Sequence, residues 1–118
     1  GETEEDLKIA KRNVAARISF YASTRTYRPA LEFHGWGDIN EALHKLSIEG
    51  KWEEMFALVT DDMVETLGFC GTGIEVANAL KNELGPICSA AMWNEVEHLG
   101  ADHSKDEHVA NLIQIAKA

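Results

Sequence analysis

The stretch that decides the fold runs from Phe20 to Asp38 and reads FYASTRTYRPALEFHGWGD. It holds five of the chain's nine aromatic residues, together with two arginines, one of the two prolines, and two glycines on either side of Trp36. A connector of this composition is seldom a solvent-exposed loop, because too much apolar ring surface would stay in contact with water. We therefore expect residues 20–38, the aromatic connector, to pack on the flanking helices or on a second chain.

On both sides of the connector, apolar residues recur at helical spacing. Before it, the pattern predicts a helix that begins after an N-cap at Thr3 and ends at about residue 22. Within it, Pro29 disfavours helical angles for Arg28, so a break is expected just before Pro29, which can itself begin a short helix. Asp38, followed three residues later by Glu41, predicts a capping box at the start of the next helix.

The second half of the chain continues with short capped helices. We expect Gly50 to end the helix that follows the connector, and Trp52 to begin an amphipathic helix whose apolar residues recur at i, i+3, i+4 and i+7. Thr60 is the expected N-cap of another short helix. Thr72 and Glu75 then have the spacing of a second capping box.

Residues 86–93 have a different pattern. After the stop signal Gly85-Pro86, both alternating faces are apolar or small, which predicts a strand buried on both sides. A lone strand leaves backbone groups unsatisfied, so it needs a partner, and the other candidate, residues 68–70, is very short. The expected fold is therefore mainly α with one or two short strands. A helix, a stop, a buried strand and a helix match the last unit of a β/α barrel.

Composition bounds the class of protein. The 118 residues suffice for a single domain, and 45% hydrophobic content is typical of a globular chain. A net charge of −9 argues against nucleic acid and anionic membrane surfaces as partners. Neither a membrane-spanning run nor a signal peptide is expected. Cys70 and Cys88 sit among apolar residues, and we expect buried free thiols in a reducing cytoplasm.

The connector also resembles a known family. Its runs FYAST from Phe20, YRP from Tyr27 and HGWGD from His34 are similar to a segment in the C-terminal part of luciferase-like flavin and deazaflavin oxidoreductases, closest to the branch that uses coenzyme F-420. The similarity continues through residues 50–55, Asp61-Asp62 and Gly71-Thr72 to the end of the chain. That family's fold is a (β/α)8 barrel more than twice this length, so the chain resembles its last third.

The resemblance implies a function for the larger protein. Family members move a hydride between the cofactor's ring and an organic substrate, or activate oxygen on reduced flavin, as luciferase-like monooxygenases do, while the protein positions the ring. The implied cofactor is coenzyme F-420 or FMN. Because this chain lacks most of the barrel, we expect no turnover from it alone, and it need not bind the cofactor by itself. The alternative is a small helical protein-interaction module without catalysis.

Two groups of residues are candidates for cofactor binding. Gly71, Thr72 and Gly73 offer backbone amides at a helix N-terminus, where a phosphate can bind, although structural capping is the favoured interpretation. The family often has proline where Gly73 stands. The resemblance also places Met92, Trp93 and Asn94 at the end of the strand that faces a barrel's active site, with core packing as the alternative for Met92 and Trp93.

No catalytic residue and no metal site can be assigned from the sequence. No nucleophile stands beside a base, and the histidines near the C-terminus are spaced by five residues rather than the four that zinc helices use. Those histidines are His98, His103 and His108.

The last expectation concerns assembly. A strand with open edges and a helix bundle with exposed apolar stripes favour a homodimer or a higher oligomer, with the strand as part of the interface. The residues expected at the interface are Tyr27, Arg28, Trp36, Trp52 and Phe56. Arg25 and Arg28 could pair with an anionic cofactor tail or with the acidic surface of a neighbouring subunit, and the net charge favours the neighbour.

Overall fold

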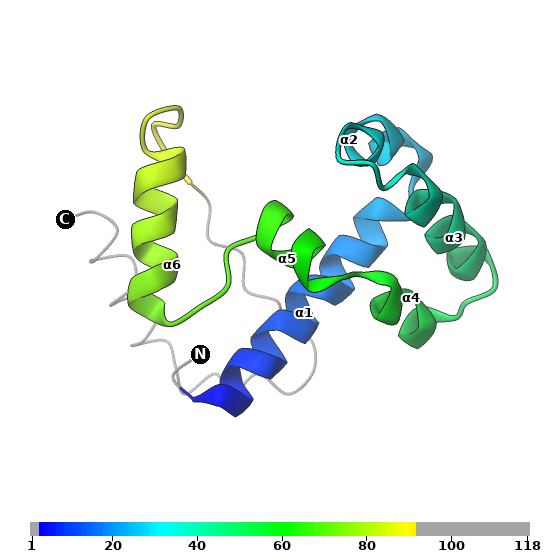
Figure 1. Ribbon diagram of the computed structural model, residues 1–118, viewed down its shortest axis with the longest axis horizontal. Helices are drawn as coiled ribbons and strands as arrows, with labels where there is room; N and C mark the ends of the chain where they lie inside the picture. The colour runs from blue at the N-terminus through cyan, green and yellow to red at the C-terminus, as the bar shows by residue number, and fades with distance from the viewer. Residues whose placement is uncertain (1–2, 92–118) are drawn as a thin grey trace. The chain divides into compact units, whose positions relative to one another are not determined.

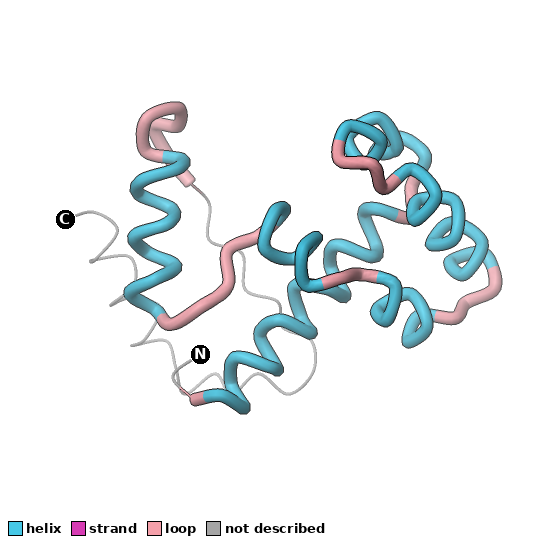
Figure 2. Tube along the Cα trace, viewed as in Figure 1, coloured by secondary structure: helices cyan, strands magenta, loops and turns pink. Residues whose placement is uncertain are grey.

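The computed structural model describes residues 3–91, and in this range the chain is mainly helical, as predicted, with no strand (Figures 1 and 2). In chain order the elements are α1 (Glu4–Ala22), the 3-10 turn η1 (Arg25–Tyr27), α2 (Arg28–Phe33), α3 (Gly37–Ile48), α4 (Trp52–Leu58), α5 (Asp61–Leu67), α6 (Gly73–Ala79) and the π-helical turn η2 (Leu80–Leu84). The predicted helix boundaries on both sides of the connector are confirmed to within a residue or two, but the break expected before Pro29 is wrong, since Arg28 has helical angles and begins α2.

The chain forms two compact units. Residues 14–68 make one unit, which contains the aromatic connector and the helices α2 to α5. Residues 1–13 and 69–118 make the other. Its described part contains helix α6, the turn η2 and the first turns of α1. The long helix α1 contributes residues to both.

Side-chain caps fix the starts of several helices. The backbone N–H of Asp6 donates to Thr3 Oγ1 over 3.1 Å, and the Thr3 N–H donates to Asp6 Oδ2 over 3.2 Å. Thr60 Oγ1 accepts from the Met63 N–H over 3.2 Å at the start of α5. These contacts satisfy amides that have no partner inside the helix. The caps predicted at Thr3 and Thr60 are therefore confirmed.

The capping box predicted at Asp38 is wrong. Helix α3 already begins at Gly37, and Trp36, its N-cap residue, makes no side-chain capping bond. The Glu41 carboxylate turns away from the helix start to two arginines, Arg25 and Arg28. Charged hydrogen bonds and ion pairs compete successfully with a reciprocal cap when cationic partners lie within reach.

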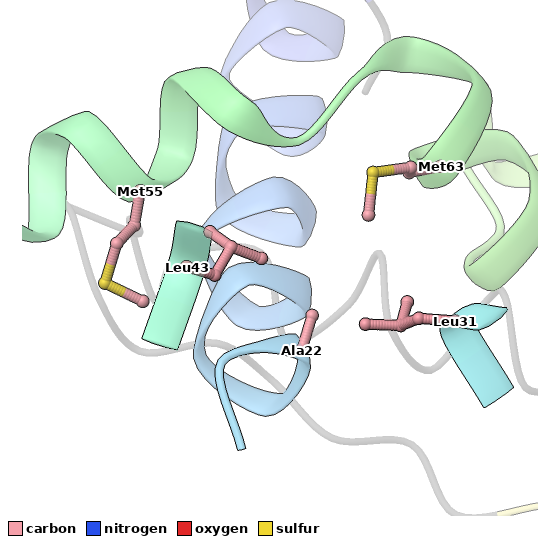
Figure 3. Packing of buried hydrophobic residues seen from close by; sticks show 5 residues of the cluster. All are labelled: Ala22, Leu31, Leu43, Met55 and Met63. Atoms are coloured by element: carbon pink, nitrogen blue, oxygen red, sulfur yellow. The ribbon is translucent and has the colours of Figure 1, made fainter. Parts of the chain in front are cut away.

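A buried cluster in residues 14–68 takes one side chain from each of five helices (Figure 3). The buried cluster consists of Ala22 of α1, Leu31 of α2, Leu43 of α3, Met55 of α4 and Met63 of α5. Met55 of the predicted stripe on α4 is in this cluster, whereas Trp52, the first residue of that stripe, is 49% exposed. Partly buried Trp36 and Phe56 pack against the same cluster. Burial of each leucine or methionine side chain of the cluster contributes roughly 1.5–3 kcal/mol, so the cluster is a main stabilising element of this unit.

The strand predicted over residues 86–93 is wrong for the part that the structure describes. After η2, the N–H groups of Ile87 and Cys88 both donate to the Leu84 carbonyl, over 3.0 and 2.7 Å, which makes a turn. Residues 86–91 are exposed, and Ile87 exposes 77% of its surface. Residues 68–70 are loop as well, so the short strand that was expected to pair with residues 86–93 does not form either. Cys88 is exposed, contrary to expectation.

Candidate functional site

The aromatic connector is held by two polar side chains of α3. Asn40 Nδ2 donates to the Ala22 carbonyl over 2.6 Å and to the Thr24 carbonyl over 3.0 Å. One turn later, His44 Nδ1 lies 3.1 Å from the Ser23 carbonyl oxygen. Because a carbonyl only accepts, His44 must carry its proton on Nδ1 in this contact. Three consecutive carbonyls at the end of α1 are thus satisfied by side chains from another helix, an arrangement that we call the carbonyl clasp.

Hydroxyl groups complete the end of α1. Ser19, Ser23 and Thr24 donate to the carbonyls of Ala16, Phe20 and Tyr21, over 2.7, 2.7 and 2.9 Å. Ser19 and Ser23 are buried, so these bonds prevent the cost of an unpaired hydroxyl. These hydroxyl groups, at the start of the connector, therefore form hydrogen bonds with the backbone of α1.

The connector's arginines are held by carboxylates of the same chain. Arg28 Nε donates to Glu32 Oε1 over 2.7 Å and Nη1 donates to Glu41 Oε2 over 3.3 Å, while Arg25 Nη2 lies 3.7 Å from Glu41 Oε1. The hydrogen bond to Glu32, with the charges of Glu32 and Glu41, raises the pKa of Arg28. An anionic ligand at Arg28 would have to displace a carboxylate, whereas Arg25, with the longer contact and a side chain 63% exposed, is more available.

Three rings of the connector form a row on the surface. Phe20 and Tyr21 meet edge to face with ring centroids 5.6 Å apart, and Tyr21 meets Tyr27 in the same way at 5.7 Å. Their exposed fractions are 56%, 46% and 47%. Edge-to-face pairs stabilise one another, so the row is an ordered apolar surface. We refer to Phe20, Tyr21 and Tyr27 as the aromatic ladder.

A second aromatic group lies between α2 and α3. The His34 ring stacks on Trp36 with centroids 4.8 Å apart, and Phe33 meets His34 edge to face at 5.1 Å. Trp36 packs against the core cluster, whereas Phe33 is 85% exposed. The connector therefore packs on its own helices through Trp36, and it presents other rings to solvent.

The residues expected at an interface differ in exposure. Tyr27 and Trp52 are about half exposed, and Arg28 is partly exposed. Trp36 and Phe56 are partly buried against the core cluster. Tyr27 and Trp52 can thus contact a partner as they stand, and the interface itself stays a prediction.

The Gly71–Gly73 turn has a carboxylate in the position that a phosphate would need. Glu75 Oε2 accepts from the Thr72 N–H over 2.8 Å and from the Thr72 hydroxyl over 2.9 Å, while the Glu75 N–H donates to Thr72 Oγ1 over 3.4 Å. This is the predicted capping box, which is confirmed. These hydrogen bonds lower the pKa of Glu75, which keeps the carboxylate charged. The turn as it stands does not fit an anionic cofactor group.

Other candidates lie outside the described residues: Met92, Trp93, Asn94 and the histidines His98, His103 and His108. Within residues 3–91, no three side chains of metal-binding type gather closely enough to hold an ion. In the same range, no helix combines the length and the apolar character needed to cross a membrane.

The sequence interpretation missed the carbonyl clasp. Asn40 and His44 stand one turn apart on the apolar side of α3, where Asn40 is 1% exposed. A polar pair at i, i+4 within an apolar stripe needs buried partners, and that spacing was the available signal.

No protein family model and no solved structure matches this chain. Proteins that do match, each described only as uncharacterized, include Rv1360 and MT1405 of Mycobacterium tuberculosis and Mb1395 of Mycobacterium bovis. Each is 40% identical to this chain over 82 residues, or 70% of the chain. The match covers 24% of each relative, so the chain aligns with about a quarter of their length.

Proposed function

We propose that this chain is the C-terminal segment of a luciferase-like oxidoreductase, in which coenzyme F-420 or FMN exchanges a hydride with an organic substrate. The observation that carries the proposal is the aromatic connector, residues 20–38, whose runs from Phe20, Tyr27 and His34 resemble that family. The hydride chemistry belongs to the cofactor. The segment's own contribution is a helical scaffold that the carbonyl clasp holds in one conformation.

The size of the relatives supports the proposal. Since 82 residues are 24% of each mycobacterial protein, each is roughly 340 residues long, within the range of about 200–400 residues for a (β/α)8 barrel. A chain of that length has room for the strands that residues 3–91 do not contain. The proposal includes a cytoplasmic location, which the free thiols Cys70 and Cys88 favour.

The described residues assign no cofactor contact. The Glu75 carboxylate lies where Gly71–Gly73 would hold a phosphate, so the turn is unsuited to one, and Met92–Asn94 lie outside the described range. We therefore expect the isolated chain to bind neither cofactor tightly. In the longer proteins, the residues outside this segment would hold most of the cofactor.

A second candidate function is a helical protein-interaction module without catalysis. The all-helical structure of residues 3–91 and the half-exposed aromatic ladder favour it. Exposed rows of aromatic rings are typical of protein interfaces. If the chain is such a module, the aromatic connector is a docking surface for another protein, and the mycobacterial relatives bind no redox cofactor.

A cofactor titration separates the two candidates. The full-length Mycobacterium tuberculosis relative is titrated with coenzyme F-420 and, separately, with FMN, while the cofactor's absorbance is followed. The oxidoreductase proposal predicts a saturable spectral change with one of the two, and this chain alone serves as the control that gives none. A folded relative that changes neither spectrum would contradict the proposal and favour the interaction module.

A further inference from the structure

Charge is distributed unevenly along this chain. From Leu7 to Leu31 the sequence carries six basic residues and no acidic residue, although the whole chain has 20 acids against 11 bases. Arg17, Arg25 and Arg28 of this stretch belong to the unit of residues 14–68 and border the aromatic ladder in sequence. Arg28 is paired with Glu32 and Glu41, and Arg25 has a longer contact with Glu41, so Arg25 is the more available cation beside the aromatic ladder.

The same unit also carries an acidic stretch with exposed apolar side chains. Residues 49–65 hold six acids and a single base, Lys51, which pairs with Glu49 over 2.8 Å. Large apolar side chains accompany these acids: Trp52 is 49% exposed and Ile48 is 74% exposed. We call this the acidic face; its members are Ile48, Glu49, Trp52, Glu53, Glu54, Asp61, Asp62 and Glu65.

We propose that the aromatic ladder and Arg25 of one copy dock on the acidic face of a second copy. Complementary charge steers such an encounter, and exposed rings beside arginine are the composition of interface centres. A second copy is the occupant because every copy carries both complementary surfaces in equal number. With a two-fold axis, each copy gives its ladder and receives its partner's, so the assembly closes as a dimer.

Arg25 is the arginine suited to reach across. Its 3.7 Å contact with Glu41 is the longest of the connector's ion pairs, and its side chain is 63% exposed. Arg28 is held twice, over 2.7 and 3.3 Å, and stays with its own chain. Across the interface, Glu54 is an exposed carboxylate two residues from Trp52 on α4. This interface needs no cofactor.

Charge reversal tests the polar half of the interface. Sedimentation velocity at micromolar concentration and low salt should show a dimer, and Arg25→Glu and Glu54→Arg should each weaken it about tenfold or more, because each places like charges together. The double variant Arg25→Glu/Glu54→Arg should recover the dimer. Recovery is the decisive result, since a merely damaged fold would not be rescued. Failure of the double variant to recover while its thermal melting is unchanged would overturn the pairing.

Ring removal tests the apolar half. Tyr27→Ser should weaken the dimer, whereas Phe33→Ser, which removes a more exposed ring outside the ladder, should leave it unchanged. About 1 M salt, where the Debye length is about 3 Å, should weaken the wild-type dimer as well. A well-folded monomer at low salt, or a dimer indifferent to Arg25→Glu and Tyr27→Ser, would overturn the proposal.

Discussion

The side chain of Asn40, in the first turn of α3, donates to the carbonyl of Ala22, the last residue of α1, over 2.6 Å. The two residues are 18 positions apart in the sequence, and Asn40 is 1% exposed. This contact closes the aromatic connector into a loop with a fixed geometry. Because a buried carbonyl without a partner is costly, the bond makes the start of α3 and the end of α1 depend on one another.

Asn40→Ala should destabilise the protein by about 1–3 kcal/mol, because the buried Ala22 carbonyl loses its donor, whereas the Thr24 carbonyl still accepts from the Tyr27 N–H. Chemical denaturation followed by far-UV circular dichroism measures the loss. Asn78→Ala is the matched control, since Asn78 is an exposed residue inside α6 and the substitution brings the same gain in helix propensity. Equal midpoints for the two variants would show that the clasp contributes nothing.

Trp36→Ala should cost about 3 kcal/mol, the lower end of the range for a buried aromatic ring, because Trp36 is only partly buried against the core cluster. Phe33→Ala removes a ring that is 85% exposed and should leave the free energy of unfolding nearly unchanged. Thermal or chemical melts of both variants check the difference. A Trp36 variant that melts like the wild type would mean that the ring is peripheral.

The capping box of α6 predicts a pH dependence. Hydrogen bonds from Thr72 lower the pKa of Glu75 below its ordinary value of 4.5, so the ionised carboxylate stabilises the folded state above that pH. This contribution should disappear as the pH falls through the lowered, folded-state pKa. An NMR titration of the Glu75 carboxyl group measures the shift directly. An unshifted titration would contradict the capping geometry.

Thr72→Ala removes the hydroxyl that accepts from the Glu75 N–H and should cost about 1 kcal/mol. It should also bring the Glu75 pKa part of the way back toward its ordinary value, because the hydrogen bond from the Thr72 hydroxyl is lost while the larger effect, from the Thr72 backbone N–H, remains. Glu75→Gln, which can keep the reciprocal bond, should lose the pH dependence with a smaller loss of stability. If Thr72→Ala left both stability and titration unchanged, the box would be incidental.

Gly35 tests the turn between α2 and α3. Its φ of +79° lies in the left-handed region, and a Cβ there would meet no atom within 4 Å. Gly35→Ala should therefore cost about 1 kcal/mol from backbone strain alone, and Gly35→Asn should cost less because asparagine tolerates this region better. Chemical denaturation compares the two. A stabilised alanine variant would show that the turn adopts another conformation.

Local patterns predicted most of the described fold. Apolar spacing and the caps at Thr3, Thr60 and Thr72 depend on residues within one turn of each other, and these elements form as expected. The same information could not place Glu41, whose carboxylate is drawn to Arg28, 13 positions earlier. Local capping chemistry was outcompeted there by an ion pair between helices.

The strand over residues 86–93 was predicted from apolar alternation alone. Such a pattern becomes a strand only when a second strand pairs with its backbone, and none is available within residues 3–91. The carbonyl clasp was missed because the partners of Asn40 and His44 are backbone carbonyls at the end of α1, which lie far away in the sequence and come close only in the folded chain. For the candidate site, the sequence predicted that the aromatic connector packs on its own helices or on a second chain. Which polar groups pair within it became known only from the structure.

The most direct measurement of the central claim exchanges this segment into the longer protein. In the full-length Mycobacterium tuberculosis relative, the matched 82 residues are replaced by those of this chain, and the affinity for coenzyme F-420 and FMN is compared with that of the parent. We predict that the folded exchange protein binds the same cofactor as the parent with an affinity within about tenfold, or 1.4 kcal/mol. An exchange protein that melts like its parent but binds no cofactor, when the parent binds one, would contradict the claim.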